Sequence, residues 1–422
     1  MLNLNFNFNF LRNIKSFIFP FYKDKDLKFI FKKLQEGFPE EKIVARFVGG
    51  CVRKYLTAEK IDDIDVATTL TTSEIKEKFK DTKFKILDTG LAHGTVTLVT
   101  NNYNVEITTL RKDVKTDGRH AQVEHINDWK LDSERRDFTI NAIYLDIYGK
   151  LFDPQMGTID LKNKNVKFIG DPQKRIQEDY LRIIRFIRFK IMYDFKIEKT
   201  TSDAIKQNLD GIKKIPKERI LIELIKILEL KNFTQINKSI NLTEIFSMVF
   251  PELIYIDRLE RLNKIYDHSK LNKEILLAVL LIDEKDNHEY FIHKYNVSNK
   301  IKEKLIRFAL DLVELKKDKD FFEKNLIRNV YINGKNHLIA LNLINFSIYS
   351  KVKLKNFTRT LNDILKTKVP RLQIDGKFLK QNGMTEGESL GKVLKEVEKE
   401  WMNNDFKISN DRVKQLINNE LN

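Results

Sequence analysis

The residues with the clearest chemical potential in this sequence are two aspartates, Asp63 and Asp65, in a segment (61–67) that reads as a strand. Side chains alternate across a strand, so both carboxylates should point to one face. Neighbouring carboxylates repel each other unless a cation holds them, and paired oxygen ligands suit Mg²⁺. Glu106 lies on a nearby predicted hairpin strand and could supply a third carboxylate. An Asp-x-Asp pair alone is more often part of a turn, so the prediction of a metal site depends on its surroundings.

A glycine turn precedes these aspartates. Gly49 and Gly50 follow an apolar run at 43–48 and lead into a segment, 51–56, that reads as the start of a helix. Such a turn lets backbone N–H groups approach a phosphate closely, and a helix N-terminus favours the anion. Arg53, one turn further on, could reach a triphosphate. A Gly-Gly turn by itself is usually only a tight turn, but together with the aspartates it predicts a site for a metal-bound nucleoside triphosphate.

Arg136, Asp137 and Asn141 form a second candidate group. Asp137 and Asn141 are four residues apart and share a face on a helical turn. A carboxylate and an amide placed in this way can hold ribose hydroxyls, while Arg136 can neutralise a phosphate. The alternative is a helix cap with surface charges.

Asp179 and Arg182 are predicted to read a base. They are three apart on a helix expected to begin at Pro172, so they should lie on one face. Cytosine and adenine each present an exocyclic amine beside an unprotonated ring nitrogen, which matches an acceptor plus a donor. Uracil and guanine present the opposite pattern and would be rejected. The alternative is an ordinary surface ion pair of little energetic value. Arg185, one turn on, would hold the pair or contact phosphate.

The basic composition of the chain indicates which kind of molecule it binds. The 422 residues carry a formal net charge of +16 and a pI near 9.4, which favours a polyanion: nucleic acid, an acidic membrane surface or an acidic protein. A general enrichment in lysine is the alternative. One cysteine excludes an intramolecular disulfide and a cysteine-based zinc site, as fits the cytoplasm. No apolar run approaches the ~20 residues needed to span a bilayer.

Strand signals are concentrated in the first 165 residues, including predicted hairpins at 95–110 and 142–152. Asp171 followed by proline is a helix start, and the amphipathic stretch continues to about Tyr193. Pro216 starts another helix, and helical periods dominate the remainder. We therefore predict an α+β fold, with a mixed head (a small sheet flanked by helices) followed by an elongated all-α region.

Several segments, in order, resemble the motifs of the class II CCA-adding enzymes and their bacterial poly(A) polymerase relatives. They are RFVGGCVRKYL with DDIDVATTL, LAHGTVTLV with VEITTLR, RRDFTINA, LFDPQMGTIDLKN, GDPQKRIQEDYLRIIRFIRF, PKERILIEL, and the tail RLQIDGKFLKQNGMTEGESLGKVLKEVEKEW. The resemblance is specific from residue 47 to 228 and weak from about 236 to 365. It implies a leader (1–24), a nucleotidyltransferase head (25–165), a nucleotide-selecting neck (166–235), a helical body (236–355) and a tRNA-binding tail (356–422).

The resemblance also implies an activity: template-independent addition of CCA to the tRNA 3′ end from CTP and ATP, with two Mg²⁺ ions and no membrane partner. Asp63, Asp65 and Glu106 would be catalytic, with the two aspartates as metal ligands. Asp117, Gly118 and Arg119 resemble the flexible loop of members that complete the CCA sequence, which favours CCA over CC-only, A-only or poly(A) addition. A silent tRNA-binding protein is the non-enzyme alternative. One departure from the family is Lys54, where an aspartate is usual.

Overall fold

The computed structural model describes residues 23–90, 94–116 and 121–421. The chain divides into two compact units, Met1–Pro251 and Glu252–Asn422, and each is described by itself. The predicted leader falls almost wholly in residues 1–22, and Asp117, Gly118 and Arg119 fall in 117–120. Both sets lie outside the described residues.

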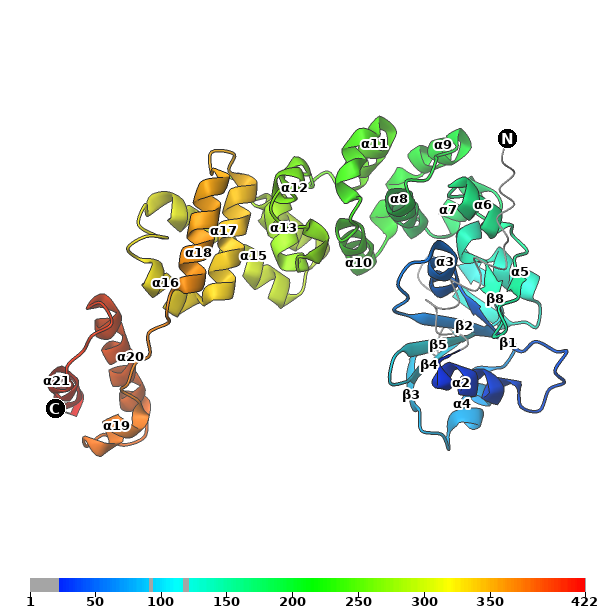
Figure 1. Ribbon diagram of the computed structural model, residues 1–422. Helices are drawn as coiled ribbons and strands as arrows, with labels where there is room; N and C mark the ends of the chain where they lie inside the picture. The colour runs from blue at the N-terminus through cyan, green and yellow to red at the C-terminus, as the bar shows by residue number, and fades with distance from the viewer. Residues whose placement is uncertain (1–22, 91–93, 117–120, 422) are drawn as a thin grey trace, which may run out of the picture. The chain divides into compact units, whose positions relative to one another are not determined.

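The first unit begins with a seven-stranded mixed sheet in the order β3-β4-β5-β2-β1-β8-β9 (Figure 1). Only the β2–β5 pair is parallel. The hairpins predicted around residues 101 and 148 are confirmed as β4–β5 and β8–β9. The strands are β1 (Ala45–Val48), β2 (Ile64–Thr68), β3 (Lys85–Gly90), β4 (Thr95–Val99), β5 (Asn104–Thr109), β8 (Tyr144–Leu145) and β9 (Leu151–Phe152). A separate two-stranded sheet pairs β6 (Arg111–Thr116) with β7 (Ala121–His125).

One face of the large sheet forms the main core of the head. Alternate strand residues such as Phe47, Val66 and Ile107 pack there against α2 (Lys25–Gln35), α3 (Gly50–Thr57) and α4 (Thr72–Phe79). Helix α4 begins with a capping box between Thr71 and Glu74, a local signal that fixes its start. The opposite face carries a smaller cluster around Tyr144 and α5 (Trp129–Glu134). Successive residues of a strand alternate between these faces, so Asp65 and Glu106, the neighbours of Val66 and Ile107, belong to the second face.

Helices complete the first unit. Asp171 caps α7 through the Lys174 N–H, with Pro172 in the first turn, as the sequence predicted. The elements are η3 (Thr139–Asn141), α6 (Gly157–Asn163), α7 (Pro172–Glu178), α8 (Leu181–Tyr193), α9 (Lys199–Gln207), η4 (Leu209–Lys214), α10 (Lys217–Leu228), η5 (Phe233–Lys238) and α11 (Ile240–Val249).

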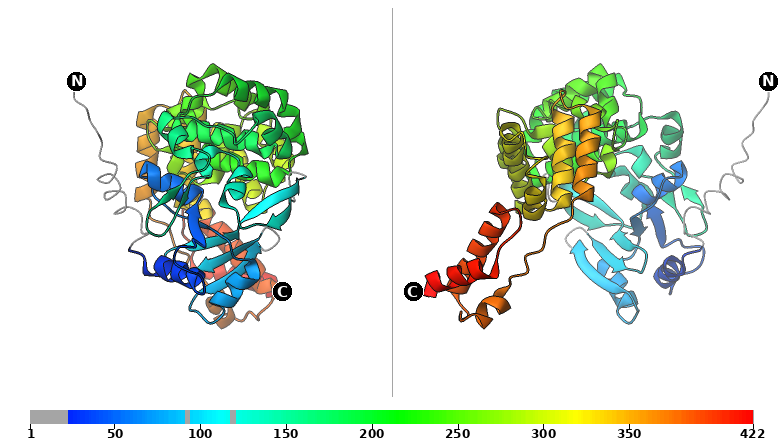
Figure 2. Two further views of the ribbon diagram at one scale, coloured as in Figure 1. Left: turned by 90° about the vertical axis from the view of Figure 1, so that its right-hand side faces the viewer. Right: turned by 60° about the vertical axis from the view of Figure 1, so that its left-hand side comes forward.

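The described residues of the second unit form helices joined by loops, and α17 and α18 lie side by side in it (Figure 2). The elements are α12 (Asp257–Leu262), η6 (His268–Lys270), α13 (Lys273–Leu281), α14 (Asn287–Tyr295), α15 (Asn299–Lys317), α16 (Leu326–Asn333), α17 (Lys335–Ile348), α18 (Leu354–Lys366), α19 (Gly376–Gln381), α20 (Glu388–Asn403) and α21 (Asn410–Leu421). The predicted α+β head and all-α remainder are thereby confirmed.

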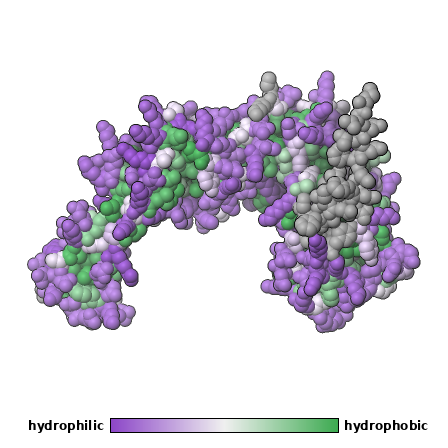
Figure 3. Space-filling view, in the orientation of Figure 1, coloured by the Kyte–Doolittle hydropathy of each residue, from purple (hydrophilic) through white to green (hydrophobic). Residues whose placement is uncertain are grey.

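Most of the surface visible in Figure 3 is hydrophilic. Over the described part of the chain, no helix combines the length and the apolar character that crossing a membrane requires.

Candidate active site

The glycine turn brings the end of β1 against an aspartate of β2. Gly49 has φ 72°, in the left-handed region that favours glycine, and α3 starts directly after it. A Cβ atom at Gly49 would lie 3.4 Å from Oδ2 of Asp65, and one at Gly50 would lie 3.9 Å from the same atom. The carboxylate and the turn that could cradle a phosphate are therefore direct neighbours.

Asp65 and Glu106 stand opposite each other on the parallel strands β2 and β5. Asp63 lies just outside β2, which begins at Ile64 rather than at the predicted residue 61, and its side chain is exposed. Burial, followed by the charges of Glu106 and then Asp63, raises the pKa of Asp65 to about 6, although the Arg136 and Arg53 charges act in the opposite direction. The site thus contains carboxylates whose mutual repulsion a cation would relieve.

These carboxylates fit an Mg²⁺ site that the protein only partly builds. Within the described residues, no group of three or more His, Cys, Asp or Glu side chains is gathered closely enough to hold a metal ion. Mg²⁺ is commonly bound through one or two carboxylates, with water and substrate phosphates completing its octahedron. Asp63 and Asp65 suit that arrangement.

The predicted site residues meet around one cavity of about 990 Å³. Its wall includes the glycine turn and aspartates of the head together with side chains of α8 and α10. The predicted residues on this wall are Gly49, Gly50, Arg53, Asp63, Asp65, Arg136, Asp137, Asn141, Asp179, Arg182 and Arg185. Glu106 is absent from the wall and approaches the site only from beside Asp65.

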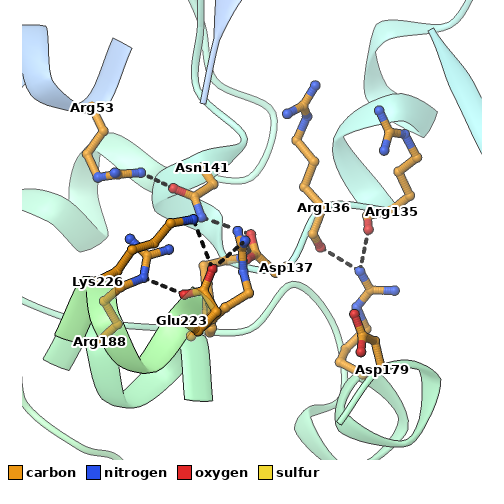
Figure 4. A network of polar contacts seen from close by, with 12 residues as sticks. Arg53, Arg135, Arg136, Asp137, Asn141, Asp179, Arg188, Glu223 and Lys226 are labelled. Carbon is orange, nitrogen blue, oxygen red and sulfur yellow. Dashed lines mark hydrogen bonds and ion pairs between the residues drawn. The ribbon is translucent and has the colours of Figure 1, made fainter. Parts of the chain in front are cut away.

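A chain of polar contacts lies along the cavity wall, from Arg53 through Asn141 to Asp137 (Figure 4), and continues to Arg185. The Arg53 guanidinium donates to the Asn141 side-chain oxygen, and Asn141 donates in turn to Asp137 at 2.9 Å. Arg185 donates to the other Asp137 oxygen at 2.7 Å. Burial opposes ionisation of Asp137, but Arg185 and the Asn141 hydrogen bond lower its pKa to about 2. Asp137 and Asn141 are thus in contact, but not on the predicted helical turn, because Phe138 between them is extended (φ −125°, ψ 147°) and the 3₁₀ turn covers only Thr139–Asn141. Arg53 is buried and also donates to the Tyr193 hydroxyl at 2.9 Å.

Arg136 is held by a carboxylate that the sequence did not single out. Asp132, fully buried in α5, accepts from Arg136 at 3.0 Å, from Arg135 at 2.9 Å and from the Tyr144 hydroxyl at 2.7 Å. Burial raises the pKa of Asp132, yet the charges of Arg136 and Arg135 outweigh it and hold the pKa at about 2. Burial lowers the pKa of Arg136, but the interactions with Tyr144 and Asp132 leave it raised overall. The guanidinium is therefore a fixed cation on the cavity wall.

The prediction that Asp179 lies on a helix begun at Pro172 is wrong. Helix α7 ends at Glu178, Asp179 is extended (φ −155°, ψ 104°), and α8 begins at Leu181. The Asp179 side chain accepts from the Leu181 N–H at 3.1 Å and from Arg219 of α10 at 2.8 Å. These contacts stabilise the break between α7 and α8, which the continuous apolar periodicity of the sequence did not indicate.

The side chains of Asp179 and Arg182 have different partners, although the Arg182 backbone N–H donates to the Asp179 carbonyl at 3.0 Å. Arg182 donates at 2.7 Å to Glu178 and at 2.7 Å to the Arg175 carbonyl. Arg185 forms an ion pair with Asp137, and the nearby charge of Asp179 also contributes to its raised pKa. Its predicted contact with phosphate stays a prediction. Both Asp179 and Arg182 still line the cavity.

Several residues that the sequence did not indicate form ion pairs or hydrogen bonds around the predicted site residues. Glu223 of α10 accepts from Arg188 at 2.7 Å and from Lys226 at 3.3 Å (Figure 4). The Arg175 guanidinium donates to the carbonyls of Arg135 and Arg136. The available signal was spacing, since Arg219 and Glu223 are four apart on one helix face.

Two family models match the chain: "Poly A polymerase head domain" over residues 45–167, and "Probable RNA and SrmB- binding site of polymerase A" over residues 194–256. Among curated proteins, the human "CCA tRNA nucleotidyltransferase 1, mitochondrial" is 32% identical over 398 residues, covering 92% of this chain and 89% of the relative. The "CCA-adding enzyme" of Ligilactobacillus salivarius (strain UCC118) is 33% identical over 389 residues, covering 88% and 92%. The chain belongs to the CCA-adding enzyme family.

Solved structures of CCA-adding enzymes share the fold. The Bacillus stearothermophilus CCA-adding enzyme in complex with CTP has a TM-score of 0.68 at 23% identity, covering 93% of this chain and 96% of that one. The Thermotoga maritima CCA-adding enzyme complexed with tRNA has a TM-score of 0.60 at 22% identity, with 98% of each chain covered.

Proposed function

We propose that this chain adds C, C and A in turn to the 3′ end of tRNA, using CTP and ATP and releasing pyrophosphate. Membership of the CCA-adding enzyme family supports this proposal, as does the name of its human relative. The observation that carries it is one cavity whose wall includes both the mutually repelling carboxylates of the head and Asp179 with Arg182.

In this proposal the head performs the chemistry. Asp63 and Asp65 would hold two Mg²⁺ ions, which when bound supply Lewis-acid activation of the attacking hydroxyl and neutralise the leaving pyrophosphate. The Gly49–Gly50 turn receives phosphate oxygens, and Arg136 adds a fixed positive charge beside them. Glu106, paired with Asp65 across the strands, would add negative charge that strengthens the attraction for the cations. Arg53 holds Asn141 through Nη1, and its Nη2 lies 4.0 Å from the position that a Gly50 Cβ would take. It therefore both positions Asn141 and Asp137 for the ribose and can contact the triphosphate.

The neck selects the base. Asp179 supplies an acceptor and Arg182 supplies donors, and together they accept the Watson–Crick edges of C and A. Arg185 steadies Asp137. We further propose that the head (25–165), neck (166–235), body (236–355) and tail (356–422) retain the predicted division of labour, with Asp117, Gly118 and Arg119 in the loop that adapts the pocket and the tail contacting tRNA.

The direct test uses purified protein, Mg²⁺ and tRNA lacking its last residues, with each labelled NTP supplied singly and then together. CCA addition requires two C residues from CTP alone and a terminal A only after them. CC alone, A alone, a poly(A) ladder or no product would each contradict the proposal in a distinct way.

The compartment is a narrower proposal. The single cysteine supports a reducing compartment, and we propose the cytoplasm. Because several relatives are named mitochondrial, localisation of a tagged full-length chain in its own cells is the appropriate test.

A further inference from the structure

Asp179 and Arg182, the proposed base-reading residues, are held by different partners: Asp179 by Arg219, and Arg182 by Glu178. The side chain of Arg219, on α10, forms a two-pronged contact with Asp179: Nη1 lies 3.3 Å from Oδ1 and Nη2 lies 2.8 Å from Oδ2. The two residues are forty positions apart in the chain. Both line the cavity, and both are largely shielded from solvent, with side-chain exposures of 31% for Arg219 and 23% for Asp179. Figure 4 shows Asp179 at the edge of the polar network.

The contact with Arg219 leaves part of the Asp179 carboxylate available to a ligand. A carboxylate has about four lone-pair positions, two on each oxygen. Oδ1 of Asp179 accepts from the Leu181 N–H and from Arg219, whereas Oδ2 accepts from Arg219 alone among the described residues. One acceptor position therefore remains, on Oδ2. A single exocyclic amine N–H of cytosine or adenine would satisfy it.

Arg182 shows the complementary pattern. Its Nη1 donates to Glu178 and to the Arg175 carbonyl, while its Nε and Nη2 have no partner among the residues that the structure describes. Its side chain is only 11% exposed, so the surrounding protein fixes the direction in which Nε and Nη2 can donate. The remaining acceptor and the remaining donors together match the edge of C or A.

We propose that Arg219 is a positioning residue for base choice, which fixes the plane of the Asp179 carboxylate so that one acceptor position is presented beside Arg182. This inference rests on the proposed function. A planar guanidinium can hold both carboxylate oxygens at once, whereas a lysine ammonium acts as a point charge. Without Arg219 only the Leu181 N–H, among the described residues, holds the carboxylate, through Oδ1, so its plane is no longer fixed and its discrimination between an amine and a carbonyl weakens.

The experiment compares kcat/KM for UTP and CTP on tRNA that lacks its CCA end. In Arg219→Gln the UTP/CTP ratio should rise by about tenfold, the loss expected when a matched contact is disordered. Arg219→Lys should also raise the ratio, although less. The matched control is Lys217→Gln, an exposed cation two positions away on α10, which should keep the wild-type ratio. Thermal melting of every variant is recorded alongside.

A double-mutant comparison separates positioning from a merely structural role. If Arg219 acts through Asp179, then Arg219→Gln should leave the ratio of an Asp179→Ala protein unchanged. A wild-type ratio in Arg219→Gln, full selectivity in Arg219→Lys, or a further change in the Asp179→Ala background would each overturn the inference. If Arg219→Gln fails to fold, the result for Arg219→Lys decides. A wild-type protein that adds no C or A would instead overturn the proposed function.

Discussion

Two groups of residues at the cavity differ in how their charges are compensated. In the head, Asp65 stands beside Glu106 and near Asp63, and its pKa is raised to about 6. Near α10, Asp179 is paired with Arg219, and Glu223 is paired with Arg188. Under the proposed function, the head carboxylates gain their counter-charge from cations that bind with the triphosphate, whereas the carboxylates near α10 are already paired within the protein. This difference separates the chemical step, common to every added nucleotide, from the selection step, which must distinguish bases.

The largest expected effect is on the reaction itself. Asp65→Ala should reduce transfer of labelled CMP by about a thousandfold or more, because the metal ligand nearest the glycine turn is lost. Affinity for tRNA, measured by filter binding, should remain close to wild type. The control is Asp81→Ala, an exposed aspartate of the head. If transfer and tRNA binding disappear together, Asp65 is a structural residue.

The next effect is on stability. Asp132→Asn should lower the free energy of unfolding at pH 7 by roughly 3 kcal/mol, because it leaves Arg136 buried without its charged partner. By contrast, Asp65→Asn should maintain or raise stability without divalent ions, since it removes repulsion. Urea unfolding measures both. The comparison fails if the two variants are destabilised equally.

The stability difference between the wild-type protein and Asp132→Asn should depend on pH. The pKa of Asp132 is about 2 in the fold, below its ordinary value of 3.8. A lowered carboxyl pKa stabilises the protein above the unfolded value, and this contribution is lost as the pH falls toward 2. The stability gap between wild type and Asp132→Asn should therefore narrow below about pH 4. A constant gap from pH 7 to pH 3 would contradict the assignment.

A smaller effect is expected on selection. Arg182→Ala should raise the relative use of UTP and GTP by about tenfold, while the affinity for triphosphate changes less. Competition by each NTP against labelled CTP measures both quantities. Unchanged discrimination would remove Arg182 from the base-reading site.

The smallest effect concerns Lys54, where the family usually has aspartate. Lys54 forms an exposed ion pair with Asp62 at 3.2 Å. Lys54→Ala should change the free energy of unfolding by less than about 0.5 kcal/mol. Its rate of CMP transfer should remain near wild type, and a large loss would instead show that Lys54 contacts the triphosphate.

Local signals in the sequence predicted the parts of the site that depend on local structure. The glycine turn, the hairpin strand that carries Glu106 and the cap at Asp171 were all indicated by neighbouring residues. The break at Asp179 was not, because the apolar periodicity of α7 continues into α8, and Arg219 contacts Asp179 from another helix. Asp132 was missed for a similar reason: its burial under Tyr144 and Arg136 depends on tertiary packing. The roles of the individual site residues stay predictions.

The single cysteine has a practical consequence. Cys51 is 1% exposed, its thiol lies 3.2 Å from the Val48 carbonyl, and burial together with the Asp65 charge raises its pKa to about 12. Thiolate is the reactive form, so maleimides should leave Cys51 of the native chain unmodified. A cysteine introduced at an exposed position such as Tyr148 would then accept a fluorophore at one defined place, without any need to delete the natural one.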